Sequence, residues 1–126
     1  MDNPNSQRIS QFQLILTGSG AVIELNGRGE FTLGRSSQIS TQGGNSTSPV
    51  RADIDLSLYQ AYEQGVSRRH AAIFIGNDLA TLTDLGSTNG TRLNGEVIPP
   101  FSPYLVHHGD IITLGKFKIQ LNIVMV

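Results

Sequence analysis

The chain has 126 residues, a formal net charge of -1 and no cysteine, and this length suits one domain with its own core. The charge provides no overall field that would attract nucleic acid or an anionic membrane, and the lack of cysteine excludes disulfides and thiolate metal sites. No apolar run approaches the roughly 20 residues that span a bilayer and the N-terminus lacks the layout of a signal peptide, so we predict a cytoplasmic protein.

Residues 1–10 are predicted to be a flexible segment before a single domain at 11–126. Within this domain apolar residues recur at every second position, most regularly at 117–123, as in a strand with one face on a core. The expected strands, in chain order, are 12–16, 21–25, 30–33, 71–75, 79–83, 110–114 and 117–123. Turns rich in Gly and Asn separate them. Many short strands of this kind indicate an all-β fold, an antiparallel sandwich or barrel.

Two segments depart from the strand pattern. Residues 36–50 consist mostly of Ser, Thr, Gly, Gln and Asn, which bury too little apolar surface to offset the entropy of ordering. We predict a long mobile loop there. Residues 57–64 carry the one helical prediction, because Ser57 and Gln60 have the spacing of a capping box and Gly65 can end a helix.

Gly34-Arg35 follows the expected strand at 30–33 and means little by itself, since turn glycines and solvated arginines are common. Further arginines lie on or beside other expected loops, at Arg51, Arg68 and Arg69. Loops from distant parts of a chain gather at the ends of a sandwich, and a rigid scaffold that presents several loops often carries a binding site. Clustered guanidinium groups suit an anion such as a phosphate.

The residues from Ser67 to His70 have two interpretations. In a hydrolase, Ser67 would be the nucleophile, His70 its base, and Asp84 or Asp110 would orient the ring. The sequence lacks the G-x-S-x-G motif of a nucleophile elbow, which disfavours this interpretation. In a binding site, the Ser67 hydroxyl and the Arg68 guanidinium would donate hydrogen bonds to a ligand, and His70 would hold neighbouring loops.

A third string, Asp-Leu-Gly-Ser-Thr-Asn-Gly-Thr at 84–91, lies between expected strands. Gly and Asn tolerate left-handed backbone, and Ser and Thr side chains fasten turns locally, so most of this string predicts a tight hairpin. Asn89 differs in kind, because its amide both donates and accepts hydrogen bonds. It can therefore bind the main chain of an extended peptide.

Other residue patterns give no support to a metal or cofactor site. His107 and His108 are adjacent, so on a strand their rings would face opposite ways. The sequence has neither a Walker-type loop nor a G-x-G-x-x-G motif, and its acidic residues are scattered. We predict no metal, no cofactor and no enzymatic activity.

Taken in order, these motifs resemble the forkhead-associated (FHA) domain, a module that reads phosphothreonine peptides. The resemblance runs from about Phe12 to Val124. The stretches that carry it are 31–35, 52–56, 66–71, 84–91, 93–95 and 109–115. It implies an FHA/SMAD-like sandwich of two twisted antiparallel sheets, with the ligand site on loops at one end.

The resemblance also implies roles for individual residues. The positions that match phosphate-contacting or peptide-contacting residues of the family are Arg35, Ser67, Arg68, Thr88 and Asn89. The positions that match its loop-supporting residues are Gly34, His70 and Gly90. Family members typically prefer phosphothreonine to phosphoserine, because the threonine methyl group packs against the binding surface.

These observations favour a non-enzymatic module that binds phosphothreonine-containing segments of a partner protein, with no nucleic-acid or membrane partner. The alternative is a phosphate-independent interaction or assembly scaffold with the same fold. The long loop expected at 36–50 is the feature that keeps this alternative open, since it lies beside Arg35 and is long enough to cover the site.

Overall fold

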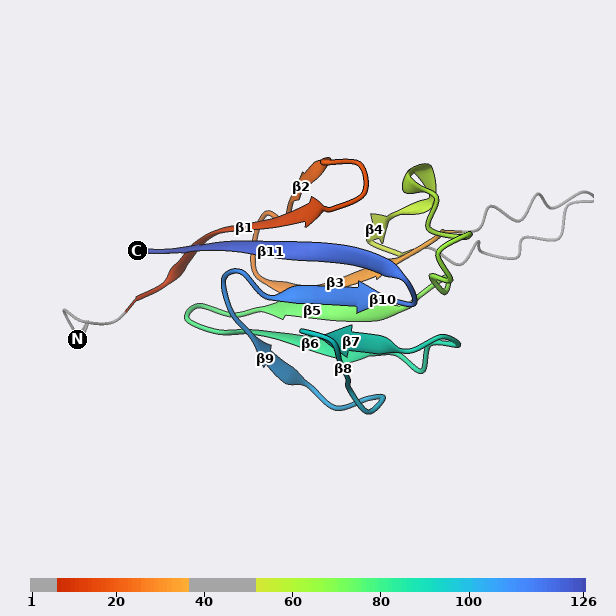
Figure 1. The fold of residues 1–126 in the computed structure, drawn as a ribbon. Helices are drawn as coiled ribbons and strands as arrows, with labels where there is room; N and C mark the ends of the chain where they lie inside the picture. Colours follow the sequence, from red (N-terminus) through yellow and green to blue (C-terminus); the bar gives the residue numbers. More distant parts are fainter. Residues whose placement is uncertain (1–6, 37–51) are drawn as a thin grey trace, which may run out of the picture.

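The computed structural model describes residues 7–36 and 52–126, which form two β-sheets stacked as a sandwich (Figure 1). Residues 1–6 and 37–51 lie outside the described residues, and with them Arg51 and nearly all of the loop predicted at 36–50. The described domain begins with a strand at Ile9, inside the segment that was predicted to precede it.

The first sheet has the strand order β2-β1-β11-β10-β7-β8, and the second has the order β4-β3-β5-β6-β9. The strands of the first sheet are β1 (Ile9–Leu16), β2 (Val22–Glu24), β7 (Thr91–Leu93), β8 (Glu96–Val97), β10 (Ile111–Leu114) and β11 (Phe117–Met125). Those of the second sheet are β3 (Gly29–Gly34), β4 (Ile54–Asp55), β5 (Ala71–Ile75), β6 (Ala80–Asp84) and β9 (Tyr104–Val106).

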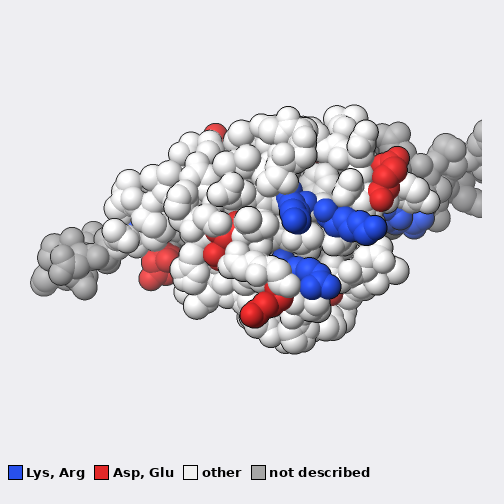
Figure 2. Space-filling view, viewed as in Figure 1, with Lys and Arg blue, Asp and Glu red and all other residues white. Residues whose placement is uncertain are grey.

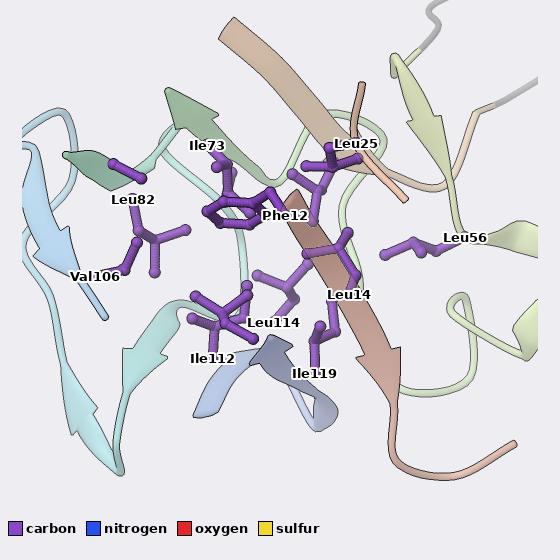
Figure 3. Packing of buried hydrophobic residues seen from close by; sticks show 14 of the residues in the cluster. Phe12, Leu14, Leu25, Leu56, Ile73, Leu82, Val106, Ile112, Leu114 and Ile119 are labelled. Atoms are coloured by element: carbon purple, nitrogen blue, oxygen red, sulfur yellow. The ribbon is translucent and has the colours of Figure 1, made fainter. Parts of the chain in front are cut away.

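The core between the sheets follows from the alternation in the sequence. In β11 the odd-numbered residues at 117–123 are buried, and Lys118 and Gln120 between them are exposed. Figure 3 shows side chains from both sheets meeting in one cluster, with Phe12 from the first sheet and Ile73 from the second. Each fully buried side chain of this size contributes about 1.5–3 kcal/mol to folding.

The structure confirms the predicted sandwich of two sheets, but one pairing differs from the prediction. Strand β4 pairs with β3 in parallel, with Leu33 opposite Ile54, so the second sheet is not wholly antiparallel. A parallel pair needs a connection of a dozen or more residues, and the stretch between these two strands is long enough. Strands β4, β7, β8 and β9 have two or three residues each, too few to show a period in the sequence.

The helix predicted at 57–64 is reduced to one 3-10 turn, η1 (Ser57–Tyr59). The Ser57 hydroxyl donates to Oδ1 of Asp55 at 2.6 Å, and no side-chain hydrogen bond caps this turn, so the expected capping box is not formed. Gln60 has a left-handed φ of 63°, which ends the helical backbone after this turn. The prediction of an eight-residue helix was therefore wrong in extent.

Three connections meet at one end of the sandwich, at the right in Figure 1, while the C-terminus lies at the other end. They are the β4–β5 and β6–β7 loops and the β10–β11 turn. The Gly115 amide donates to the Gly90 carbonyl at 3.0 Å, and the Lys116 amide donates to the Gln64 carbonyl at 2.8 Å. These bonds tie the turn to both loops, so this end of the domain is one connected surface.

Candidate functional site

The end of β3 is packed closely against the segment at 66–70. Gly34 is buried, and a Cβ atom at this position would lie 2.0 Å from the carbonyl oxygen of Arg68. Only glycine therefore lets the two backbones approach in this way. The Arg35 amide donates to the Ser67 carbonyl at 3.1 Å, which places Ser67 and Arg68 beside Arg35.

The Arg35 side chain is fixed by two contacts. Its Nε donates to the Val66 carbonyl at 2.8 Å, and its Cζ lies 4.8 Å from the centroid of the Tyr62 ring, within the range of a cation–π interaction. Within the described part of the chain these contacts leave the two terminal Nη groups for a ligand. Holding the guanidinium in advance reduces the entropy that a bound anion would cost.

His70 joins the segment at 66–70 to the β6–β7 loop. Its ring is fully buried, and Nδ1 accepts a hydrogen bond from the Ser67 amide at 2.9 Å. Nε2 must then carry the proton, which it donates to the Gly90 carbonyl at 2.8 Å. Burial lowers the pKa of His70, although the Gly90 carbonyl and Asp84 oppose this shift. The neutral ring is the form that both bonds require.

The same contacts contradict the hydrolase interpretation of Ser67 and His70. Nδ1 of His70 is occupied by the backbone amide of Ser67, and Nε2 faces the carbonyl of Gly90, so neither ring nitrogen is placed to take a proton from the Ser67 hydroxyl. That hydroxyl oxygen instead accepts a hydrogen bond from the Thr88 amide at 3.2 Å. The described residues therefore form no Ser-His-Asp triad at this position.

The β6–β7 loop is folded around the buried carboxylate of Asp84. Oδ1 accepts bonds from the hydroxyls of Ser87 and Thr91, both at 2.6 Å. Oδ2 accepts bonds from the amides of Gly86 at 3.0 Å and Ser87 at 3.2 Å. Burial raises the pKa of Asp84, but these hydrogen bonds outweigh it and hold the pKa below its ordinary value. The carboxylate is thus charged and sets the shape of the loop.

Thr88 and Asn89 occupy the exposed tip of this loop. The Thr88 amide bonds to the hydroxyl of Ser67, and Nδ2 of Asn89 donates to the Gly65 carbonyl at 3.0 Å. Gly90 then turns the chain with a φ of 83°, a conformation that favours glycine. The tip is therefore attached to the β4–β5 loop by both residues.

The structure brings Arg35, Ser67 and Thr88 together by direct bonds and places Asn89 beside them through Gly65. Arg68 is exposed on the same segment as Ser67. Figure 2 shows Lys and Arg side chains on this face from the middle of the molecule toward this end, with acidic side chains at their margins. The charge is therefore concentrated locally on a chain that has no net positive charge.

Two residues have supporting roles that were not predicted from the sequence. Asp84 was considered only as a hydrolase residue, although Gly two positions later and Ser three positions later are the donors of a local carboxylate-bound turn. Tyr62 gave no signal, because its contact with Arg35 depends on how the β4–β5 loop packs.

Within the two described ranges, no group of His, Asp and Glu side chains is arranged to hold a metal ion. No helix in these ranges is long and apolar enough to cross a membrane. The guanidinium and hydroxyl donors at this end of the domain suit capture of an anion.

Comparison with known proteins agrees with this fold. The chain is similar to an FHA domain solved in a study of phosphothreonine-dependent FHA domain interactions, with a TM-score of 0.66, 30% identity, and coverage of 90% of this chain and 96% of that chain. It is also similar to the FHA domain of FhaA in complex with an intracellular domain of another protein, with a TM-score of 0.64, 30% identity, and coverage of 88% and 99%.

Among curated proteins, the chain is similar to the human "Angiogenic factor with G patch and FHA domains 1", with 39% identity over 67 residues. The match covers 48% of this chain and 9% of that protein, so the chain spans a small part of the relative's length. A family model described as FHA domain matches residues 31–115. Because this match covers more than half of the chain, the protein belongs to the FHA domain family.

Proposed function

We propose that this domain is a non-enzymatic recognition module that binds phosphothreonine-containing segments of a partner protein. The observation that carries the proposal is the junction of Arg35, Ser67 and Thr88, which come from three separate loops and are linked by hydrogen bonds. His70 and Asp84 hold two of these loops, so the donors are in place before a ligand arrives.

The donors at this junction suit a phosphate group, which carries about -1.5 to -2 charge and three acceptor oxygens. The Ser67 oxygen accepts a bond from the Thr88 amide, and no described residue accepts the Ser67 hydroxyl proton, which can therefore point at a ligand. The terminal groups of Arg35 and the exposed side chain of Arg68 supply charge-assisted donors beside it. Each such bond contributes roughly 1.5–3 kcal/mol.

The peptide around the phosphothreonine has a place to lie next to Asn89. A groove of about 520 Å³ is lined by Asn89, Gly65 and Lys116, among others. Asn89 uses its Nδ2 group on the Gly65 carbonyl, which leaves its amide oxygen to accept a backbone N–H from an extended peptide. The proposal therefore assigns the phosphate to Arg35 and Ser67 and the peptide backbone to Asn89.

The relatives support this proposal by what is known of them. One similar FHA domain was studied for phosphothreonine-dependent interactions, and another was solved with the intracellular domain of another protein. The cytoplasmic location, the lack of a cofactor and the domain boundaries at 11–126 stay predictions from the sequence.

An oriented peptide array tests the proposal directly. Each peptide has one fixed threonine, phosphorylated in one copy of the array and unmodified in the other. We expect binding to a subset of the phosphorylated peptides and none to their unmodified counterparts. Equal binding to both copies would contradict the proposal and favour the phosphate-independent scaffold.

A further inference from the structure

A second groove, of about 420 Å³, lies beside the candidate site, and the proposed function does not use it. It is lined by residues from the end of β1 and the turn that follows, from η1, and from the start of β11. Leu16 and Phe117 are buried residues of this lining, and Leu58 and Tyr59 belong to η1. We call it the Leu58 groove.

Leu58 is an unusual surface residue, because 88% of it is exposed, the highest value for a large apolar side chain in the described ranges. The turn that presents it has a fixed shape. The Ser57 amide and hydroxyl both donate to Asp55 Oδ1, and Gln60 follows in a left-handed conformation, which costs energy in a residue with a Cβ atom. An exposed apolar side chain that projects from a turn of fixed backbone at the edge of a groove is a candidate contact for a binding partner.

The charges around the Leu58 groove favour an acidic occupant. Lys116 and Lys118 line it, and its described lining contains no Asp or Glu. Lys118 and Arg92 both pair with Thr113, from the two neighbouring strands, so their side chains lie on the same face of the sheet. Figure 2 shows Lys and Arg side chains grouped on this face with acidic side chains at the margins of the group, and the two lysines that line the groove itself attract negative charge.

The Leu58 groove borders the groove beside Asn89. Gln64 and Lys116 line both grooves, and the hydrogen bond from the Lys116 amide to the Gln64 carbonyl, 2.8 Å long, forms the boundary between them. A peptide that lies along Asn89 therefore needs only to pass Lys116 to enter the Leu58 groove. One extended segment can occupy both.

We propose that the Leu58 groove binds a second part of the same phosphorylated segment, a bulky apolar residue flanked by acidic residues. The apolar residue packs against Leu58 and Tyr59, and the acidic residues face Lys116 and Lys118. This inference rests on the proposed function, because the phosphothreonine holds the segment at Arg35. The groove then adds affinity and selects among phosphorylated partners.

Two phosphothreonine peptide libraries test the inference. One is randomised over about four residues on each side of the phosphothreonine, and the other over about twelve. Because an extended chain advances about 3.3 Å per residue, the long library reaches much farther from the phosphothreonine than the short one. We expect the long library to select a bulky apolar residue with acidic neighbours at a constant distance from the phosphothreonine. The selected long peptide should bind about tenfold more tightly than its version shortened to the short format, as burial of one large apolar side chain allows. Binding is measured by fluorescence anisotropy.

Two variants and a control locate the added affinity. Leu58→Ala should remove the tenfold advantage of the long peptide and leave the short peptide unaffected, and Lys118→Glu should remove most of it. Leu105→Ala is the matched control, because Leu105 is a leucine of the other sheet that is 55% exposed. This control should behave as the unmodified protein with both peptides.

The groove inference and the proposed function fail in different ways. If long and short peptides bind equally, or if Leu58→Ala weakens both by the same factor, the inference about the groove is wrong while phosphate dependence stands. If unmodified peptides bind as tightly as phosphorylated ones, the proposed function itself is wrong. A preference for basic residues in the long library would also overturn the inference.

Discussion

The two sides of the candidate site are held in place by different chemistry. The segment at 66–70 is docked onto Gly34 and bonded through the neutral ring of His70, contacts that join residues distant in sequence. The loop at 84–91 is organised by the charged carboxylate of Asp84, whose side-chain partners are at most seven positions away. One side is thus set by tertiary packing and the other by a local network, and the Thr88–Ser67 bond joins them.

Because of this difference, the two sides are expected to respond differently to substitutions and to pH. A local network around a charge depends on one carboxylate and survives as long as that group stays ionised. A docked segment depends on the fit of two backbones and on one buried imidazole that must stay neutral. Substitutions and pH can therefore disturb one side before the other.

The largest effect is expected from Asp84→Ala, which removes the centre of the local network. Thr91 is fully buried, and its hydroxyl loses the Asp84 carboxylate as acceptor. The donors of Gly86 and Ser87 lose the same acceptor. Because an unsatisfied buried partner costs about 1–3 kcal/mol, we expect a loss of about 3 kcal/mol or more in the free energy of unfolding, measured with urea. Asp78→Ala, at an exposed position, is the control and should change little. A loss below about 1 kcal/mol would remove Asp84 from this role.

Gly34→Ala should disturb the docked side instead. The new Cβ atom would lie 2.0 Å from the Arg68 carbonyl oxygen, so the segment at 66–70 must move. We expect a loss of about 2–3 kcal/mol, as for overpacked sites, with the largest NMR shift changes in that segment rather than at 84–91. Gly18→Ala has open space around the new atom and should be nearly neutral. Equal unfolding free energies for the two variants would contradict the close approach.

Mild acid should weaken the docked side first. The pKa of His70 lies below its ordinary 6.5 in the folded protein, so the unfolded chain binds the proton more readily. The contribution of His70 to the free energy of unfolding is therefore fully present above about pH 6.5 and falls as the pH drops below that value. The pKa of Asp84 lies below its ordinary 3.8, so its contribution is lost only in much stronger acid.

Denaturant unfolding of the unmodified protein and of His70→Gln across this range measures the effect. The unmodified protein should lose stability more steeply below about pH 6.5. His107 and His108 are present in both proteins, so the difference in slope isolates His70. If the free energies of unfolding of the two proteins change in parallel with pH, the neutral ring of His70 does not contribute to stability.

Tyr62→Ala should have the smallest effect. It removes the ring under the Arg35 guanidinium, a contact worth about 0.5–1 kcal/mol at an exposed site. Calorimetry should show phosphothreonine peptide binding weakened about two- to fivefold, with thermal stability almost unchanged. Tyr62→Phe keeps the ring and should bind as the unmodified protein does. Weakening by Tyr62→Phe equal to that by Tyr62→Ala would exclude the cation–π contact as the cause.

The sequence predicted those features that depend on local pattern. The strand at 117–123 was found because its apolar residues alternate, and the two-sheet sandwich is confirmed. The short strands such as β4 and its parallel pairing were missed, because two residues show no period and pairing depends on the partner strand. The helix at 57–64 was overestimated, since Gln60 adopts a left-handed conformation and no side chain caps the turn, so the helical backbone ends after Tyr59.

The candidate site was likewise predicted only in part. The resemblance to a family pointed to residues such as Arg35, Ser67 and Asn89, and the structure places them at one end of the sandwich. Gly34, His70 and Gly90 were also predicted to support these residues, but the contacts that hold the loops were not readable from the sequence. Tyr62 contacts Arg35 only after the β4–β5 loop has folded over it, and the tautomer of His70 follows from bonds to two different loops.

Calorimetric titration of Arg35→Ala with a phosphothreonine peptide chosen from the array tests the central claim most directly. Because one charge-assisted bond contributes roughly 1.5–3 kcal/mol, we expect binding to weaken about tenfold to hundredfold without unfolding of the domain. Arg69→Ala, an exposed arginine on the same segment as Ser67, is the control and should bind nearly as the unmodified protein. Unchanged binding by Arg35→Ala would contradict the assignment of the phosphate to this site.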